Sequence, residues 1–301
     1  MRSRPRRVPG RAHSEAALRQ RFLAGDGPDR RRRGAVRGLS APPAGELAAA
    51  GALLALGAGI SAFGLARLAR AAVPPPPRPF ARLRGSDLVL AFALLLLLPA
   101  LIARLWAGDL RQLTVLGLLL LNLAVVLAAL AWLRWRAGRE PPPPPPPRTL
   151  AWALGAYLWS VPAGLALLRV NALLVQAWSG TPPEQSVGDA LRAASGPSLA
   201  GALVLAVVVQ PVVEELLFRG YLQRFLAARP DIGPVRALIL SAAVFALFHE
   251  SAVVLPIFAI GLLFGWVYWR TGSLHASILL HVLHNGIGTL GLLLLSRDSS
   301  P

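Results

Sequence analysis

Apolar residues fall into eight long runs, separated by short polar or proline-rich stretches. Most runs reach the roughly 20 residues that an α-helix needs to cross the hydrocarbon core of a bilayer. The pattern predicts an all-α fold, a polytopic membrane helix bundle of about eight transmembrane helices. The run at 236–249 is short, and we expect it to be buried among its neighbours. The runs cover residues 45–66, 88–107, 112–133, 150–178, 199–226, 236–249, 252–269 and 274–295.

Two proline-rich breaks divide this pattern, one at 74–79 and one at 141–147. Such segments form stiff, extended connectors and cannot be helical. We predict four parts along the chain. These are a disordered Arg/Pro-rich tail over 1–43, N-terminal transmembrane helices over 44–140, a proline-rich linker over 141–148, and a C-terminal membrane domain over 149–296.

Composition supports a membrane protein. Of 301 residues, 55% are hydrophobic and only 15% are charged, whereas a soluble domain carries about 25% charged residues. The formal net charge of +17 does not indicate nucleic-acid binding, because twelve of the 31 basic residues lie in the first 40 positions and most others flank apolar runs. Basic flanks suit membrane orientation and anionic lipid head groups. We therefore expect a multi-pass protein of the cell membrane with lipids, not nucleic acid, as partners. Cysteine is absent, which excludes thiolate chemistry.

Three ionisable residues interrupt the run at 199–226: Glu214, Glu215 and Arg219. Each such group at membrane depth costs about 2.5–3.5 kcal/mol on insertion scales, so a functional role is the default interpretation. On a helix, Glu215 and Arg219 share a face at i,i+4, while Glu214 points about 100° away. We predict that Arg219 neutralises Glu215 and that Glu214 faces another helix. The alternative is a purely structural ion-pair cluster.

Two later runs carry further polar groups. Phe245 and His249 share a face near the end of one predicted helix, and His281 and Asn285 share a face of the last one. A lone histidine in an apolar helix is more often structural than catalytic. Here, however, three separate runs each contribute a costly polar group. We therefore predict that Glu214, His249, His281 and Asn285 converge, with His284 in a packing role.

These side chains suit the attack of water on an amide carbonyl. A carboxylate in a bundle can act as general base, with an imidazole beside it to hold the same water. A second imidazole and a carboxamide can donate hydrogen bonds to a developing oxyanion. A metal is the alternative, because Glu214, His249 and His281 are a usual ligand set for Zn²⁺. The helical zinc motif H-E-x-x-H is absent, since Ser251, Ala252 and Val253 follow Glu250.

The chain resembles the CPBP family, which comprises the CAAX prenyl endopeptidases and their bacterial relatives, also called the Abi family. The resemblance rests on Glu214-Glu215-x-x-x-Arg219, Phe245-x-x-x-His249 and His281-x-x-x-Asn285, in this order on successive runs. It covers about residues 199–290. It implies that residues 149–296 form a catalytic CPBP-like domain of an intramembrane endopeptidase.

By position, the resemblance implies that Glu214 acts with His249 on the attacking water. His281 and Asn285 would stabilise the oxyanion, and Glu215 with Arg219 would brace the site beside Phe245. The family has been described both as metalloproteases and as glutamate proteases. The orientation of His281 with Asn285 favours metal independence, because asparagine is a poor zinc ligand.

Two other classes of function remain open. A proton-coupled transporter could use the carboxylate–histidine cluster as a relay, although it should then show internal repeats. A non-catalytic membrane scaffold or immunity protein is the other alternative. For the endopeptidase, the expected substrate is a peptide or a membrane protein.

Overall fold

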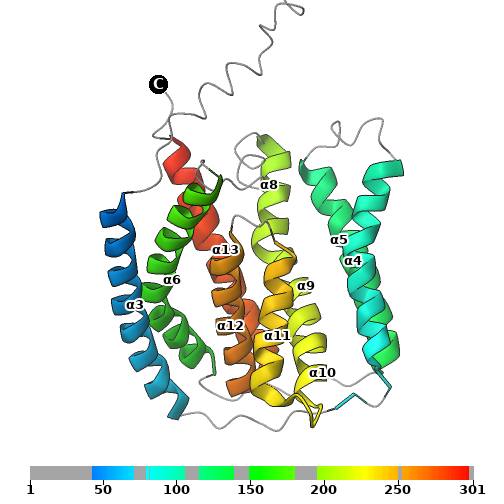
Figure 1. Cartoon of the computed structure of the whole chain (residues 1–301). Coiled ribbons are helices and arrows are strands. Elements are labelled where there is room, and N and C mark those ends of the chain that lie inside the picture. Colours follow the sequence, from blue (N-terminus) through cyan, green and yellow to red (C-terminus); the bar gives the residue numbers. More distant parts are fainter. Residues whose placement is uncertain are drawn as a thin grey trace, which may run out of the picture.

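All the regular structure in the described part of the chain is helical, which confirms the predicted fold class. The computed structural model describes residues 43–70, 79–80, 82–105, 115–138, 149–179, 195–249 and 253–297. The predicted tail up to residue 42, the linker over 141–148 and the loop over 180–194 lie outside these ranges. The helices shown in Figure 1 are α3 (Ala44–Arg70), α4 (Gly85–Leu105), α5 (Val115–Ala137), α6 (Thr149–Ser179), α8 (Gly196–Val204), α9 (Gln210–Glu215), α10 (Arg224–Ala227), α11 (Gly233–Leu247), α12 (Val254–Thr271) and α13 (Leu274–Arg297).

Five of the described helices are long and apolar enough to cross a membrane. They are α3, α6, α12, most of α13, and a continuous helix over Gly196–Ala227 that contains α8, α9 and α10. The described apolar part of α4 and the whole of α11 are shorter. The predicted short helix at 236–249 therefore exists, but α11 ends at Leu247, so His249 lies just beyond it and not within it.

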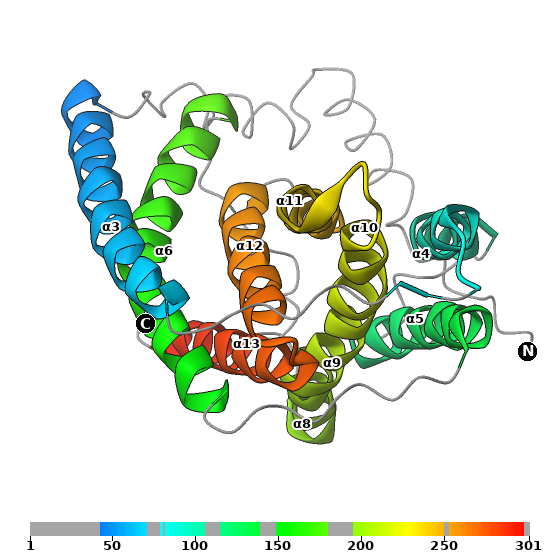
Figure 2. The ribbon, with the colours of Figure 1, turned by 90° about the horizontal axis from the view of Figure 1, so that it is seen from below.

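Helix α12 stands in the middle of the arrangement, between α6 and α11 (Figure 2). Helix α3 covers the outer side of α6 along its length. Two glycines permit this close approach. A Cβ atom on Gly57 would come within 2.6 Å of the Pro162 carbonyl oxygen, and one on Gly64 would overlap the Trp159 ring. Backbone contact through small residues is the usual way in which membrane helices pack.

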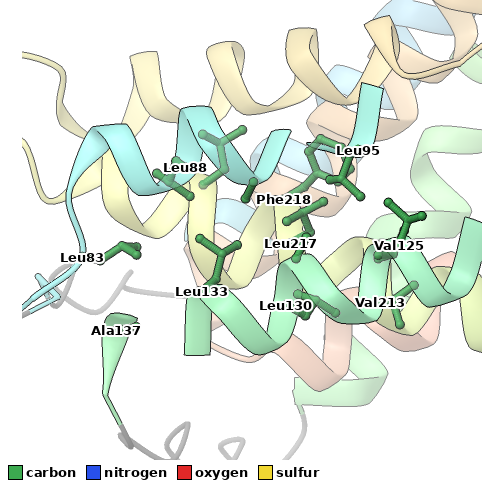
Figure 3. Close-up of a cluster of buried hydrophobic side chains, with 14 of the residues drawn as sticks. Leu83, Leu88, Leu95, Val125, Leu130, Leu133, Ala137, Val213, Leu217 and Phe218 are labelled. Atoms are coloured by element: carbon green, nitrogen blue, oxygen red, sulfur yellow. The ribbon is translucent and has the colours of Figure 1, made fainter. Parts of the chain in front are cut away.

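Helices α4 and α5 form a pair that packs against the side of the long Gly196–Ala227 helix (Figure 3). Leucine and valine side chains of the pair meet Val213, Leu217 and Phe218 in a cluster whose members are less than a tenth exposed. Val213 and Leu217 flank the Glu214–Glu215 pair in sequence. The apolar side chains of Val213 and Leu217 therefore hold this part of the central helix against α4 and α5. The carboxylates of Glu214 and Glu215 point elsewhere.

Arginines gather at one end of the bundle. Arg67 and Arg70 lie in the last turns of α3, Arg134 and Arg136 in the last turn of α5, and Arg270 in the last turn of α12. These helix ends all lie at the lower edge of Figure 1. The start of α3 and the end of α13 lie at the opposite edge. In the described helices, the terminal arginines of α3, α5 and α12 therefore lie at the same end of the bundle.

Candidate functional site

The central helix Gly196–Ala227 departs twice from α-helical geometry, on either side of the two glutamates. Residues Leu205–Val209 and Leu216–Gln223 are π-helical, and the α-helical piece Gln210–Glu215 lies between them. Short π-helical insertions occur often at functional sites, because the extra residue per turn re-aims side chains. The first π-helical segment ends two residues before Pro211, the proline of this helix piece.

Glu215 and Arg219 form a buried ion pair, as the i,i+4 spacing predicts. The Arg219 Nη1 atom lies 2.7 Å from Glu215 Oε1, and both side chains are at most 1% exposed. Arg219 also lies over the rings of Phe245 and Phe264, with its guanidinium carbon 4.6 and 5.5 Å from the two centroids. The charge of Arg219 therefore meets a carboxylate at one side and aromatic faces at the others, which suits a desolvated guanidinium.

Two glycines of α12 leave their backbone carbonyls accessible to side chains of the central helix. Arg219 Nη2 donates to the Gly261 carbonyl at 2.9 Å, and Gln223 Nε2 donates to the Gly265 carbonyl at the same distance. A Cβ atom on Gly265 would come within 2.6 Å of the Gln223 side chain. The two donors are four residues apart, as are the two glycines, so the helices are held in register by two matching polar contacts.

His281 connects the ion pair to Glu214. Its Nδ1 atom lies 2.9 Å from Glu215 Oε1, and its Nε2 atom lies 3.6 Å from Glu214 Oε2. Because the carboxylate of Glu215 can only accept, Nδ1 carries the hydrogen, and the second nitrogen of a neutral ring then offers a lone pair to Glu214. The predicted convergence of Glu214 and His281 from different helices is therefore present.

Glu214 is held from its own helix. Gln210 Nε2 donates to Glu214 Oε1 at 2.8 Å, which leaves Oε2 directed at His281. The Glu214 side chain is 15% exposed, whereas that of Glu215 is fully buried. The two adjacent carboxylates thus occupy different environments. One is enclosed by partners and the other is accessible, which is the division that helical geometry predicts.

His249 joins this group through the ring of Phe245. The two ring centroids are 4.7 Å apart, and His249 Nδ1 lies 2.8 Å from the Phe245 carbonyl oxygen. That carbonyl must accept, so Nδ1 is the donor, and Nε2 of the neutral ring is left as an acceptor. The Phe245 ring also contacts His281 with a centroid separation of 5.8 Å. One phenyl ring therefore lies against both imidazoles.

Asn285 is oriented by a carbonyl in the first π-helical segment. Its Nδ2 atom donates to the Ala206 carbonyl at 3.0 Å. In this segment the Gln210 N–H donates five residues back, to the Leu205 carbonyl. The next donor in register would be residue 211, but Pro211 has no N–H. The Ala206 carbonyl therefore lacks this backbone donor and can accept from Asn285. The Asn285 amide has one further N–H, which this bond does not engage.

His284 packs away from this group, as predicted. Its Nδ1 atom lies 3.2 Å from the hydroxyl oxygen of Tyr157 on α6. Sequence reasoning missed the side chains that hold the site from behind, namely Gln210, Ser277 and the α12 residue Phe264. Ser277 and Gln210 each lie four residues before a predicted site residue, so the helical repeat was a signal that could have found them. Nothing in the order of residues along α12 marked Phe264.

The zinc alternative requires Glu214, His249 and His281 to surround one ion. In the described ranges, no group of three or more histidine, aspartate or glutamate side chains is arranged to hold a metal ion. His281 Nδ1 and His249 Nδ1 contact protein acceptors, so each ring would offer only Nε2 to an ion. The donor set as placed does not form a metal centre, so we derive no step through a metal.

Residues 196–287 match the family model described as "Rce1-like: Type II CAAX prenyl endopeptidase Rce1-like". The match begins at the first residue of α8 and ends within α13, so it contains every residue of the site described above. It confirms the resemblance predicted from the three motifs. No curated protein and no solved structure matches the chain.

Proposed function

We propose, from the premise that residues 196–287 form an Rce1-like domain, that this chain is an intramembrane endopeptidase of the CAAX type. The family implies protease activity on a peptide or protein in the membrane. The observation that carries the proposal for this chain is the pairing of two unlike carboxylates. Glu214 is 15% exposed and its Oε2 atom lies 3.6 Å from His281 Nε2, while Glu215 is enclosed with Arg219.

Glu214 is the proposed general base. Its carboxylate takes a proton from a water molecule while the water oxygen attacks the scissile carbonyl carbon. His249 Nε2, an acceptor because Nδ1 donates to Phe245, accepts a hydrogen bond from the second O–H group of the same water and so orients it. The protonated Glu214 then gives its proton to the leaving amine nitrogen as the C–N bond breaks. Glu214 ends the cycle ionised.

Asn285 is the proposed donor to the oxyanion. Its amide is held by the Ala206 carbonyl, and the remaining N–H is available to the developing negative charge. The resemblance pairs His281 with Asn285 in this role. The contacts of His281 favour a place beside Glu214 instead, where Nε2 can accept a hydrogen bond from the protonated carboxyl group. Both assignments of His281 are tested by the same variants as the other site residues.

The substrate is proposed to be a peptide or a membrane protein of the cell membrane, in which the chain is multi-pass. To identify it, membranes from cells producing the wild type or Glu214→Gln are compared by mass spectrometry for released peptides. The identified peptide is then followed in proteoliposomes. We expect Glu214→Gln to lower kcat by on the order of 10²–10⁴-fold, the contribution of a general base, without loss of folded protein.

A matched control for this experiment is Glu46→Gln, because Glu46 is a half-exposed carboxylate paired with Arg169 outside the matched segment. We expect it to cleave at the wild-type rate. Cleavage by Glu214→Gln at the wild-type rate would contradict the proposed mechanism. Proton flux into liposomes that needs Glu214, in the absence of cleavage, would favour the transporter alternative. Zinc bound in a 1:1 ratio and lost together with cleavage would replace the metal-independent scheme.

A further inference from the structure

The contacts behind the site give Ser277 a role that the three motifs do not include. Ser277 lies on α13, one helical turn before His281, and is fully buried. Its hydroxyl donates to Glu215 Oε2. His281 faces the other oxygen, Oε1, of the same carboxylate. Two residues at i,i+4 on α13 therefore hold the two oxygens of one glutamate that belongs to a different helix.

We infer that Ser277 is a positioning residue, whose hydroxyl fixes the Glu215 carboxylate so that His281 keeps its hydrogen on Nδ1 and its lone pair toward Glu214. The kinetic consequences of this inference rest on the proposed function, whereas the placement of the hydrogen does not.

Three donors share the two oxygens of Glu215. Oε1 receives Arg219 Nη1 at 2.7 Å and His281 Nδ1 at 2.9 Å, and Oε2 receives Ser277. Without the serine hydroxyl, Oε2 would be a buried anionic oxygen to which neither Arg219 nor His281 donates. The planar guanidinium of Arg219 presents parallel N–H groups that bind both oxygens of a carboxylate well. The carboxylate would therefore gain by turning toward Arg219, and this rotation withdraws Oε1 from His281.

Loss of the Oε1 contact changes which nitrogen of His281 carries the hydrogen. The hydrogen bond made by one ring nitrogen sets the tautomer of the other. With Nδ1 unpartnered, the ring gains the Nε2–H form, which places a hydrogen and not a lone pair in front of Glu214. A histidine in the wrong tautomer cannot accept from the protonated glutamate. Ser277 thus acts on the reaction indirectly, through the side chains of Glu215 and His281.

A second acceptor gives the competing explanation. The Ser277 hydroxyl also lies 3.2 Å from the Phe264 carbonyl oxygen, and one hydroxyl has one hydrogen to donate. A bond to the charged carboxylate is the stronger of the two. If the hydrogen went to Phe264 instead, the serine would only tie α13 to α12, and its removal would affect stability alone.

Ser241 provides a matched control. It is also a buried serine, and its hydroxyl donates to a backbone carbonyl, that of Phe218, at 3.0 Å. Its hydroxyl therefore makes the kind of bond that the competing explanation assigns to Ser277. Ser241→Ala measures what the loss of one buried structural hydroxyl costs in this bundle, because this hydroxyl bonds to the Phe218 carbonyl and not to Glu215 or His281.

The first experiment needs no substrate. The full chain is labelled with ¹⁵N at its histidines, and the nitrogen shifts report the tautomer of each ring. The His281 signals are assigned by their loss in His281→Gln. We expect the wild type to hold His281 as Nδ1–H. In Ser277→Ala the ratio of Nδ1–H to Nε2–H should fall by about tenfold, which is the factor that one buried hydrogen bond carries.

The second experiment measures cleavage, with an internally quenched peptide ending in a prenylated CAAX sequence, or with the peptide identified from membranes, as the probe. We expect Ser277→Ala to lower kcat by about tenfold, the factor that one buried hydrogen bond carries, with KM unchanged. Ser241→Ala should keep the wild-type kcat and the wild-type His281 tautomer.

The outcomes separate the two proposals. An unchanged His281 tautomer in Ser277→Ala, or an equal change in Ser241→Ala, overturns the positioning role whether or not the chain cleaves anything. A changed tautomer in a protein that cleaves no peptide supports the placement of the hydrogen and counts against the endopeptidase. A changed tautomer together with a lowered kcat supports both.

Discussion

Two arginine–carboxylate pairs of nearly equal length lie in different regions of this bundle. Arg219 and Glu215 meet at 2.7 Å in the centre, and both side chains are at most 1% exposed. Arg136 and Asp87 meet at 2.8 Å where α5 ends and α4 begins, and the Arg136 side chain is 29% exposed. The distances do not distinguish the pairs. Their surroundings do, because a partly exposed pair can be solvated and a fully buried one cannot.

The remaining contacts of each carboxylate show the same difference. The second oxygen of Asp87 accepts from the backbone N–H of Arg84, three residues away, so this carboxylate serves the start of its own helix. Glu215 instead binds Ser277 and His281 from α13, in addition to Arg219. One pair joins two neighbouring helices at their ends. The other connects the central helix to the residues that we propose carry the chemistry.

Among the variants that test this comparison, Arg219→Ala is expected to have the largest effect on stability. It leaves Glu215 as a buried charge without its main partner, which typically costs about 3–5 kcal/mol. We expect a strong loss of folded protein in detergent, measured as the fraction that elutes as a single species and as the thermal midpoint. The double variant with Glu215→Ala should recover part of the loss. If Arg219→Ala folded as well as the wild type, the central pair would not be a brace.

Pro211→Ala is expected to change stability less than Arg219→Ala does. It should raise stability but lower activity. The new N–H can donate to the Ala206 carbonyl and compete with Asn285 for it. A proline inside a helix costs about 3 kcal/mol or more, so the variant should be at least as stable as the wild type. The kcat should fall by about tenfold, because the Asn285 amide loses the acceptor that orients it. Thermal midpoint and kcat are measured on the same preparation. A variant that gains stability and keeps its kcat would separate Asn285 from the proposed oxyanion role.

The smallest effect is expected from Arg136→Ala. This pair is partly exposed, so its removal should lower the free energy of unfolding by about 1 kcal/mol at most. We expect cleavage at the wild-type rate, since the Asp87 carboxylate binds Arg84 and Arg136 and not the residues of the site. Arg169→Ala, which removes the half-exposed pair with Glu46, is the matched reference and should change the stability less still. A loss in Arg136→Ala as large as that in Arg219→Ala would remove the distinction between the two regions.

The sequence predicted the helices and the ion pair between Glu215 and Arg219, for a physical reason. Long apolar runs must be helical in a bilayer, because every backbone N–H and C=O group has to be satisfied within the segment. The i,i+4 spacing of Glu215 and Arg219 is local geometry, and the pair forms as expected. The end of α11 was predicted two residues too late. Phe248 is apolar and His249 is tolerated in a helix, so nothing in the sequence marks Leu247 as the last helical residue.

What the sequence determined by itself is therefore the set of costly polar groups and their order on successive helices. Only the tertiary structure decided their partners on other helices. The contacts of Ser277 with Glu215, of Asn285 with Ala206 and of Arg219 with Gly261 each join residues 42 to 79 positions apart. Such contacts depend on the rotation and the depth of each helix against its neighbours. Those are set by side-chain packing and by small residues such as Gly261, and the helical repeat of a single segment does not contain them.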